Sequence, residues 1–68
     1  MSDIFEDAEE EFYRITRGRD YESPEHLLSV LVEEVGEVAR AINDNDKKQY
    51  REELIQVMAV AAAMIKNS

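Results

Sequence analysis

The last third of this chain contains an apolar run that limits how the chain can fold. Nine consecutive residues, from Val57 to Ile65, are apolar, and they continue a segment with helical periodicity. A helix that is apolar on every side has to be buried on every side. Because two further helices of a 68-residue chain are not expected to cover it, the run predicts a homo-oligomeric helical bundle. The alternative is that alanine faces of this helix are tolerated at the surface.

Size, charge and residue types exclude several classes of protein. The chain has 68 residues, no Cys and one His, which excludes a disulfide framework and a thiolate or multi-His metal site. The net charge of -8 argues against a nucleic-acid polymer or an anionic membrane as partner and favours a cation as ligand. The N-terminus has no features of a signal peptide, and the apolar run is shorter than the ~20 residues that span a bilayer. We therefore expect a cytoplasmic protein.

Hydrophobic spacing and capping residues predict an all-α chain. Three helices are expected, over residues 3–17, 24–43 and 47–66. Ser23 is a good N-cap for the second helix, and Pro24 stands where its first residue should be. Asp46, with Gln49 three residues later, resembles a capping box for the third helix. We expect residues 1–68 to form a single three-helix domain that assembles with copies of itself.

The second predicted helix has an apolar stripe whose members alternate in steps of three and four. These members are Leu28, Leu31, Val35, Val38 and Ile42. Such a stripe is expected to pack against other helices. At 100° per residue, Glu34 and Glu37 lie on one flank of the stripe, one turn apart, and Glu33 lies closer to solvent.

The third predicted helix has Glu53 and Gln56 at the edge of its own apolar stripe. If the two helices pack antiparallel, the side chains of Glu34, Glu37, Glu53 and Gln56 surround one pocket. Carboxylates one turn apart on facing helices can hold a divalent metal ion in a bundle, and oxygen ligands select Mg²⁺ or Mn²⁺. With 16 acidic residues in the chain, the same side chains can also be explained as solvated helix faces.

Gly36 stands inside the second predicted helix, between these acidic residues. Glycine at an interior helical position costs about 1 kcal/mol relative to alanine. The close approach of another helix or of a ligand usually offsets that cost. The neighbouring carboxylates also repel one another, and a bound cation would relieve the repulsion.

The segment Leu31–Ile42 resembles the first motif, EExxE, of the MazG-like, all-α nucleoside triphosphate pyrophosphohydrolases. Its three acidic positions are held here by Glu33, Glu34 and Glu37. The second family motif, ExxD, is matched by Glu53, with Gln56 in the place of the usual Asp. The resemblance extends over residues 27–65.

The resemblance implies an enzyme that hydrolyses a nucleoside triphosphate to the monophosphate and pyrophosphate, in nucleotide-pool housecleaning. It implies Mg²⁺ as cofactor, with Mn²⁺ as an alternative, and assembly as a homodimer or a dimer of dimers. The residues that match metal ligands are Glu34, Glu37, Glu53 and Gln56. Glu33 and Glu34 match the catalytic positions, where Glu33 would orient water or act as a base.

The cations that bind the substrate phosphates are less well defined by the sequence. The candidates are Arg40, Arg51 and Lys66. Gln56 carries no charge, so we expect weaker metal binding than in a chain with Asp at this position. The alternative function is therefore a non-catalytic helical dimer that binds nucleotide or metal, or a regulatory interaction module.

Overall fold

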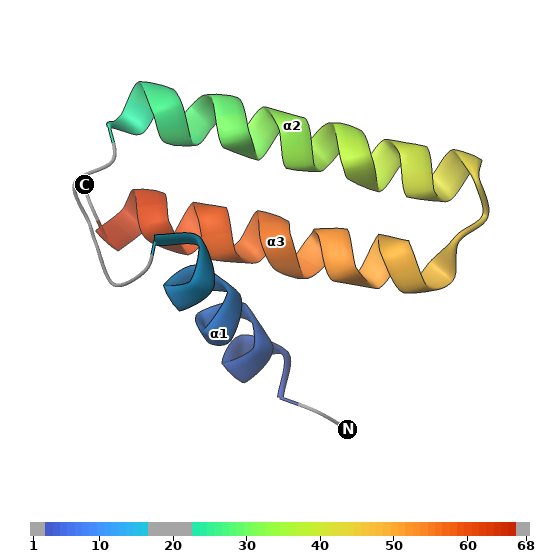
Figure 1. Ribbon diagram of the computed structural model, residues 1–68, viewed down its shortest axis with the longest axis horizontal. Coiled ribbons are helices and arrows are strands. Elements are labelled where there is room, and N and C mark those ends of the chain that lie inside the picture. The colour runs from blue at the N-terminus through green and yellow to red at the C-terminus, as the bar shows by residue number, and fades with distance from the viewer. Residues whose placement is uncertain (1–2, 17–22, 67–68) are drawn as a thin grey trace.

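The computed structural model describes residues 3–16 and 23–66, which form helices and no strands. The helices are α1 (Ile4–Thr16), α2 (Pro24–Asn43) and α3 (Lys47–Lys66) (Figure 1). Over the described residues, the prediction of an all-α chain with three helices is confirmed. The predicted end of the first helix at Arg17 lies outside the described residues. Assembly of the chain with copies of itself stays a prediction.

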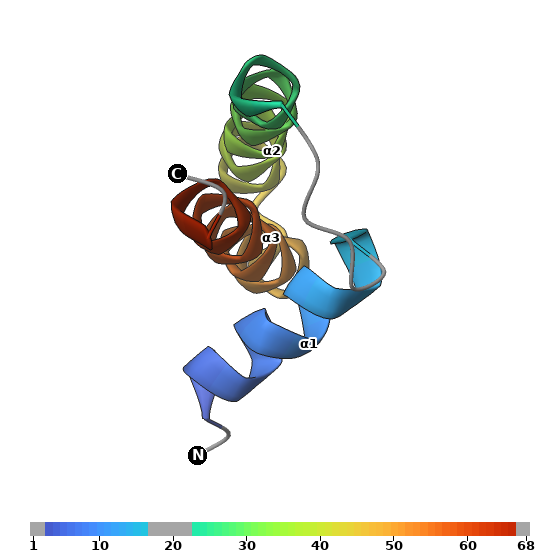
Figure 2. The ribbon, with the colours of Figure 1, turned by 90° about the vertical axis from the view of Figure 1, so that its left-hand side faces the viewer.

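The helix α3 occupies the centre of the structure. It forms an antiparallel hairpin with α2, and α1 packs on its other side (Figures 1 and 2). Among the described residues, α3 contacts both other helices, whereas α1 and α2 do not contact each other. Residues of α3 therefore face two different helices, and the outer side of α2 faces away from the rest of the described chain.

The turns and helix starts follow from capping residues. The Ser23 hydroxyl oxygen accepts a hydrogen bond from the backbone N–H of His26 at 3.2 Å. Asp46 Oδ1 accepts one from the backbone N–H of Gln49 at 3.0 Å, as expected for an N-cap. Asn45, with a φ of 55°, adopts the left-handed conformation that reverses the chain between α2 and α3. The side chain of Gln49 does not complete the predicted capping box but bonds to a residue one turn further along α3.

The core between the helices consists of small side chains. Its buried apolar residues are Ala8, Leu27, Ala41, Ala59, Val60 and Ala63, and Val60 has the largest fully buried side chain. Because α2 and α1 cover different sides of α3, only Ala62 and Ile65 are exposed within the apolar run. Of its nine residues, only Ala59, Val60 and Ala63 are buried and four more are half-buried, so two helices of the same chain cover this run only in part. No helix among the described residues is long and apolar enough to cross a membrane.

The face that α2 turns toward α3 differs from the predicted stripe. Leu27 and Ala41 are 2% exposed, whereas Leu28, Val35 and Ile42 are 51, 53 and 60% exposed. The buried residues each precede a member of the predicted stripe by one position. Because one residue corresponds to a rotation of 100° about the helix axis, the packed face is rotated from the predicted face by about that angle. The helix has two adjacent apolar stripes, and only one of them can face α3.

The alanine at position 59 provides a test of how closely the helices pack. Ala59 is fully buried, so we expect the replacement Ala59→Leu to lower the free energy of unfolding by about 1–3 kcal/mol through overpacking. The same change at the exposed Ala62 is the matched control and should shift it by less than about 0.5 kcal/mol. Urea unfolding at one protein concentration measures both variants. Equal losses for the two would contradict the packing described here.

Candidate functional site

Two carboxylates meet where α2 packs on α3. Glu34 lies seven residues from both Leu27 and Ala41, on the face of α2 that contacts α3. Its carboxyl group lies next to that of Glu53 on α3, close enough for the two to share a hydrogen bond when one of them is protonated. Two ionised carboxylates in such a contact repel each other, so a shared proton or an added cation stabilises the pair.

The surroundings of Glu34 favour its protonated form. Burial is the main cause, followed by the hydrogen bond and the negative charge of Glu53 and then by the charges of Glu37 and Glu33. Together they raise the pKa of Glu34 from 4.5 to about 7. The two predicted ligands Glu34 and Glu53 are therefore brought together at a position that favours an added positive charge.

The side chain of Gln49 holds Glu53 in place. Gln49 Nε2 donates a hydrogen bond to Glu53 Oε1 at 2.6 Å, one turn along α3. The sequence interpretation assigned Gln49 to a capping box and missed this role. Its spacing of four residues from Glu53 is the signal that could have shown the contact.

The two remaining acids of the first motif differ in their exposure to solvent. Glu37 is half-buried, and its Oε1 lies 3.8 Å from Arg40 Nη1. Both residues line a hollow of about 280 Å³ together with Gln49. Arg40 is therefore a cation beside the acidic residues, as its predicted role in substrate binding requires. Glu33 is exposed, in agreement with its expected position closer to solvent.

Gln56 is directed toward α1. Its Nε2 donates a hydrogen bond to Glu11 Oε2 at 2.5 Å. Glu11 also accepts hydrogen bonds from Arg14 on its own helix. The hydrogen bonds from Arg14 are the main reason why the pKa of Glu11 lies below its usual value, and the Gln56 amide adds to the effect. The role of Gln56 as a metal ligand stays a prediction.

Glu11 belongs to an acidic groove between α1 and α3. The groove has a volume of about 420 Å³ and is lined by Asp7, Glu10, Glu11, Arg14, Glu52, Glu53, Ile55 and Gln56. Glu53 is therefore placed between Glu34 of α2 and the acids of α1. Glu11 is half-buried in this groove, whereas its neighbour Glu10 is exposed. Nothing in the local sequence shows this contact, because residues 11 and 56 belong to different helices.

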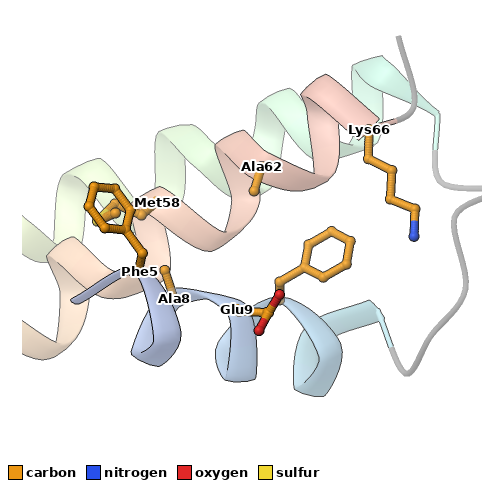
Figure 3. Close-up of a pocket in the computed structure, with 7 residues that line it drawn as sticks. Phe5, Ala8, Glu9, Met58, Ala62 and Lys66 are labelled. Atoms are coloured by element: carbon orange, nitrogen blue, oxygen red, sulfur yellow. The ribbon is translucent and has the colours of Figure 1, made fainter. Parts of the chain in front are cut away.

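The other two candidate substrate-binding cations contact α1. Arg51 Nη2 lies 3.2 Å from Asp7 Oδ2. The Lys66 ammonium lies 5.4 Å from the centre of the Phe12 ring. Lys66 stands at one end of an apolar groove between α1 and α3, with Phe5 at the other end (Figure 3). The structure thus places Arg51 and Lys66 against α1 and Arg40 beside the acids of α2.

The complete set of predicted metal ligands is not assembled as expected. In the ranges 3–16 and 23–66, no three His, Cys, Asp or Glu side chains are arranged so that they could hold a metal ion. The structure brings Glu34 and Glu53 into contact, with Glu37 near enough to affect the pKa of Glu34. Gln56 bonds to α1 instead.

The raised pKa of Glu34 predicts how stability depends on pH. Between pH 4.5 and about 7 the folded chain binds more protons at this site than the unfolded chain does, so the free energy of unfolding should fall as pH rises. The replacement Glu34→Gln should remove this fall and raise the melting temperature at pH 8. Thermal melts from pH 5 to pH 8 test this, with Glu25→Gln as control, because Glu25 is exposed and is not among the charges that raise the pKa of Glu34. An unchanged pH profile in Glu34→Gln would contradict the assignment.

The contact between Gln56 and Glu11 predicts an energetic coupling between α3 and α1. The replacement Gln56→Glu should lower the free energy of unfolding, because it replaces a hydrogen bond by two neighbouring negative charges. Adding Glu11→Gln should recover about 1 kcal/mol, because an amide again faces a carboxylate. Urea unfolding of both single variants and the double variant measures the coupling. Additive losses would show that the two side chains do not interact.

Comparison with known proteins places this arrangement in a family. Residues 22–67, more than half of the chain, match the model of the MazG nucleotide pyrophosphohydrolase domain. The match includes α2 and α3, which contain Glu34 and Glu53, and leaves α1 outside. No match was found among curated proteins or among solved structures. The chain belongs to the MazG nucleotide pyrophosphohydrolase domain family.

Proposed function

We propose that this protein is a Mg²⁺-dependent nucleoside triphosphate pyrophosphohydrolase. It would convert a ribo- or deoxyribonucleoside triphosphate and water into the monophosphate and pyrophosphate, as a step in nucleotide-pool housecleaning. Membership of the family supports the class of reaction. The observation in this chain that carries the proposal is the contact between Glu34 and Glu53 across the packed helices.

The chemistry of these side chains fits a hard divalent cation. Glu34 and Glu53 are carboxylates that need a positive charge between them, and a metal ion can replace the proton that they share. We assign Glu34, Glu37 and Glu53 to hold the ion. Glu34 and Glu53 already meet, and Glu37 would have to approach them when the ion binds, since no three acids of the described residues are arranged around an ion. When bound, Mg²⁺ neutralises phosphate charge and lowers the pKa of a bound water.

Other residues of the chain have supporting roles in this proposal. Gln49 orients Glu53 through its hydrogen bond, so the carboxylate keeps one position on α3. Glu33 is exposed and can orient the attacking water together with Glu34. Arg40 is the cation beside the acids and would contact a phosphate of the substrate. We also propose that the active form is a homodimer or a larger homo-oligomer.

The contact of Gln56 with Glu11 favours the alternative function. In this chain the residue at the place of the family Asp is neutral and is bonded to α1. Metal binding then depends on carboxylates alone, without a fourth charged ligand. A protein that binds nucleotide or metal without turnover would have the same contacts.

Pyrophosphate release from a panel of nucleoside triphosphates tests the proposal. With Mg²⁺ present we expect turnover, and EDTA should abolish it. The replacement Glu53→Gln removes a proposed ligand charge and should lower the rate by about 100-fold or more. The matched control is Glu25→Gln, an exposed residue in the first turn of α2, which should leave the rate unchanged.

Thermal melting of the same samples separates the two functions. A folded-state ligand raises the melting temperature, so a metal-binding protein should melt higher with Mg²⁺ than with EDTA. A higher melting temperature without pyrophosphate release from any nucleotide would support the non-catalytic alternative. No effect of Mg²⁺ or of nucleotide on either measurement would contradict both the enzyme and the binding protein, and only the regulatory interaction module would be left.

A further inference from the structure

The outer face of α2 has an apolar stripe that the described chain leaves uncovered. Its members follow one another at intervals of four, three, four and three residues: Leu28, Val32, Val35, Ala39 and Ile42. The four large side chains among them are between 51 and 61% exposed. The helix α3 packs on another face of α2, and the described part of α1 does not contact α2 (Figure 2). An apolar stripe of this length usually marks an interaction surface.

Between Leu28 and Ile42 the positions beside this outer stripe are free of charge, and the exposed Glu25 lies on the same side as Ser29, one turn before the stripe begins. On one side they are Ser29, Gly36 and Asn43, and on the other side they are the half-buried Leu31 and Val38. This is unusual in a chain in which 35% of the residues are charged. Two copies that each have a net charge of -8 repel each other, so a contact between them is favoured where acidic residues are absent. The neutral flanks therefore favour a second copy of the chain as the occupant.

Gly36 provides a separate indication of close contact on this face. A Cβ atom at this position would meet nothing within 4 Å in the described chain. Packing inside the protomer therefore does not explain a glycine in the middle of α2. Gly36 is exposed and follows Val35, the central residue of the outer stripe. A glycine at this point allows the backbone of another helix to come close.

The spacing of the outer stripe matches a two-fold symmetric contact. Leu28 and Ile42 each lie seven residues from Val35, in opposite directions. A two-fold axis at Val35 therefore pairs Leu28 of one copy with Ile42 of the other and places the two copies of Val35 side by side. The contact is self-complementary, as a symmetric dimer requires.

We propose that a second copy of this chain docks on the outer face of α2, with the two α2 helices antiparallel and crossing at Val35 and Gly36. This arrangement specifies the homodimer of the proposed function and does not depend on its chemistry. Glu34 points toward α3 and lies outside the contact, so each copy keeps its own pair of carboxylates. Activity and dimerisation can therefore be tested separately.

Sedimentation velocity over a range of protein concentrations tests the proposed contact. We expect the wild-type chain to be dimeric and Val35→Lys to dimerise about 30-fold more weakly or worse. The matched control is Phe5→Lys, because Phe5 is an apolar residue of α1 that is 71% exposed. It should leave the dimer intact. A wild-type chain that is monomeric throughout, or a loss of dimer in Phe5→Lys alone, would overturn the proposal.

The replacement Gly36→Ala should have opposite effects on two quantities, the stability of the monomer and the affinity of the dimer. Alanine favours the helix, so Gly36→Ala should raise the melting temperature of the dilute monomer. The added methyl groups lie at the crossing and should weaken dimerisation. A dimer of unchanged or greater affinity would show that Gly36 does not lie at the crossing.

Disulfide trapping determines the orientation, even if Val35→Lys fails to fold. The chain has no Cys, so each introduced cysteine is the only one. Under mild oxidation, Val35→Cys should form a covalent dimer and the control Phe5→Cys should not. A mixture of Leu28→Cys and Ile42→Cys should give mainly the mixed dimer in a mass spectrum. Covalent dimers formed mainly between two Leu28→Cys chains would show a parallel arrangement and overturn the proposal.

Discussion

The packing of α2 on α3 over small side chains is the constraint on which the rest of the structure depends. Three of the five buried apolar residues of α2 and α3 are alanines, and Val60 is the largest fully buried side chain. Small side chains let two helix backbones come close together. Polar groups at the same interface are then within hydrogen-bonding distance, so Glu34 meets Glu53. Large side chains at these positions would hold the helices further apart and separate the carboxylates.

This packing brings together two carboxyl groups whose contact does not by itself stabilise the folded chain. A half-buried acid next to another acid costs free energy when both are ionised. This cost disfavours the ionised form of Glu34 and so raises its pKa. The Gln49 side chain bonds to Glu53 and does not complete a capping box at the start of α3. Proteins that depart from local rules in this way commonly do so at functional sites. The two departures occur at one place, which supports the assignment of the site.

The sequence predicted the features that depend on near neighbours along the chain. Helix starts at Ser23 and Asp46 follow from side chains that bond three residues ahead, and these bonds are present. Glu34 and Glu53 were identified by spacing and by resemblance. The rotation of α2 could not be predicted, because its two apolar stripes differ by one residue and the surface of α3 selects between them. The contact of Gln56 with Glu11 depends on how α1 crosses α3, which no local pattern specifies.

The two stripes of α2 explain how so acidic a chain can form both a site and a dimer. Leu27, Glu34 and Ala41 repeat every seven residues on the face toward α3, and the outer stripe repeats at the next residue in each case. A rotation by one residue would move Glu34 away from Glu53 and would also bury the outer stripe inside the protomer. The contact with α3 therefore sets both faces at once. It keeps Glu34 on the inner side of α2, where a cation can neutralise it. The outer stripe stays uncharged, so a second copy of this negatively charged chain can pack on it.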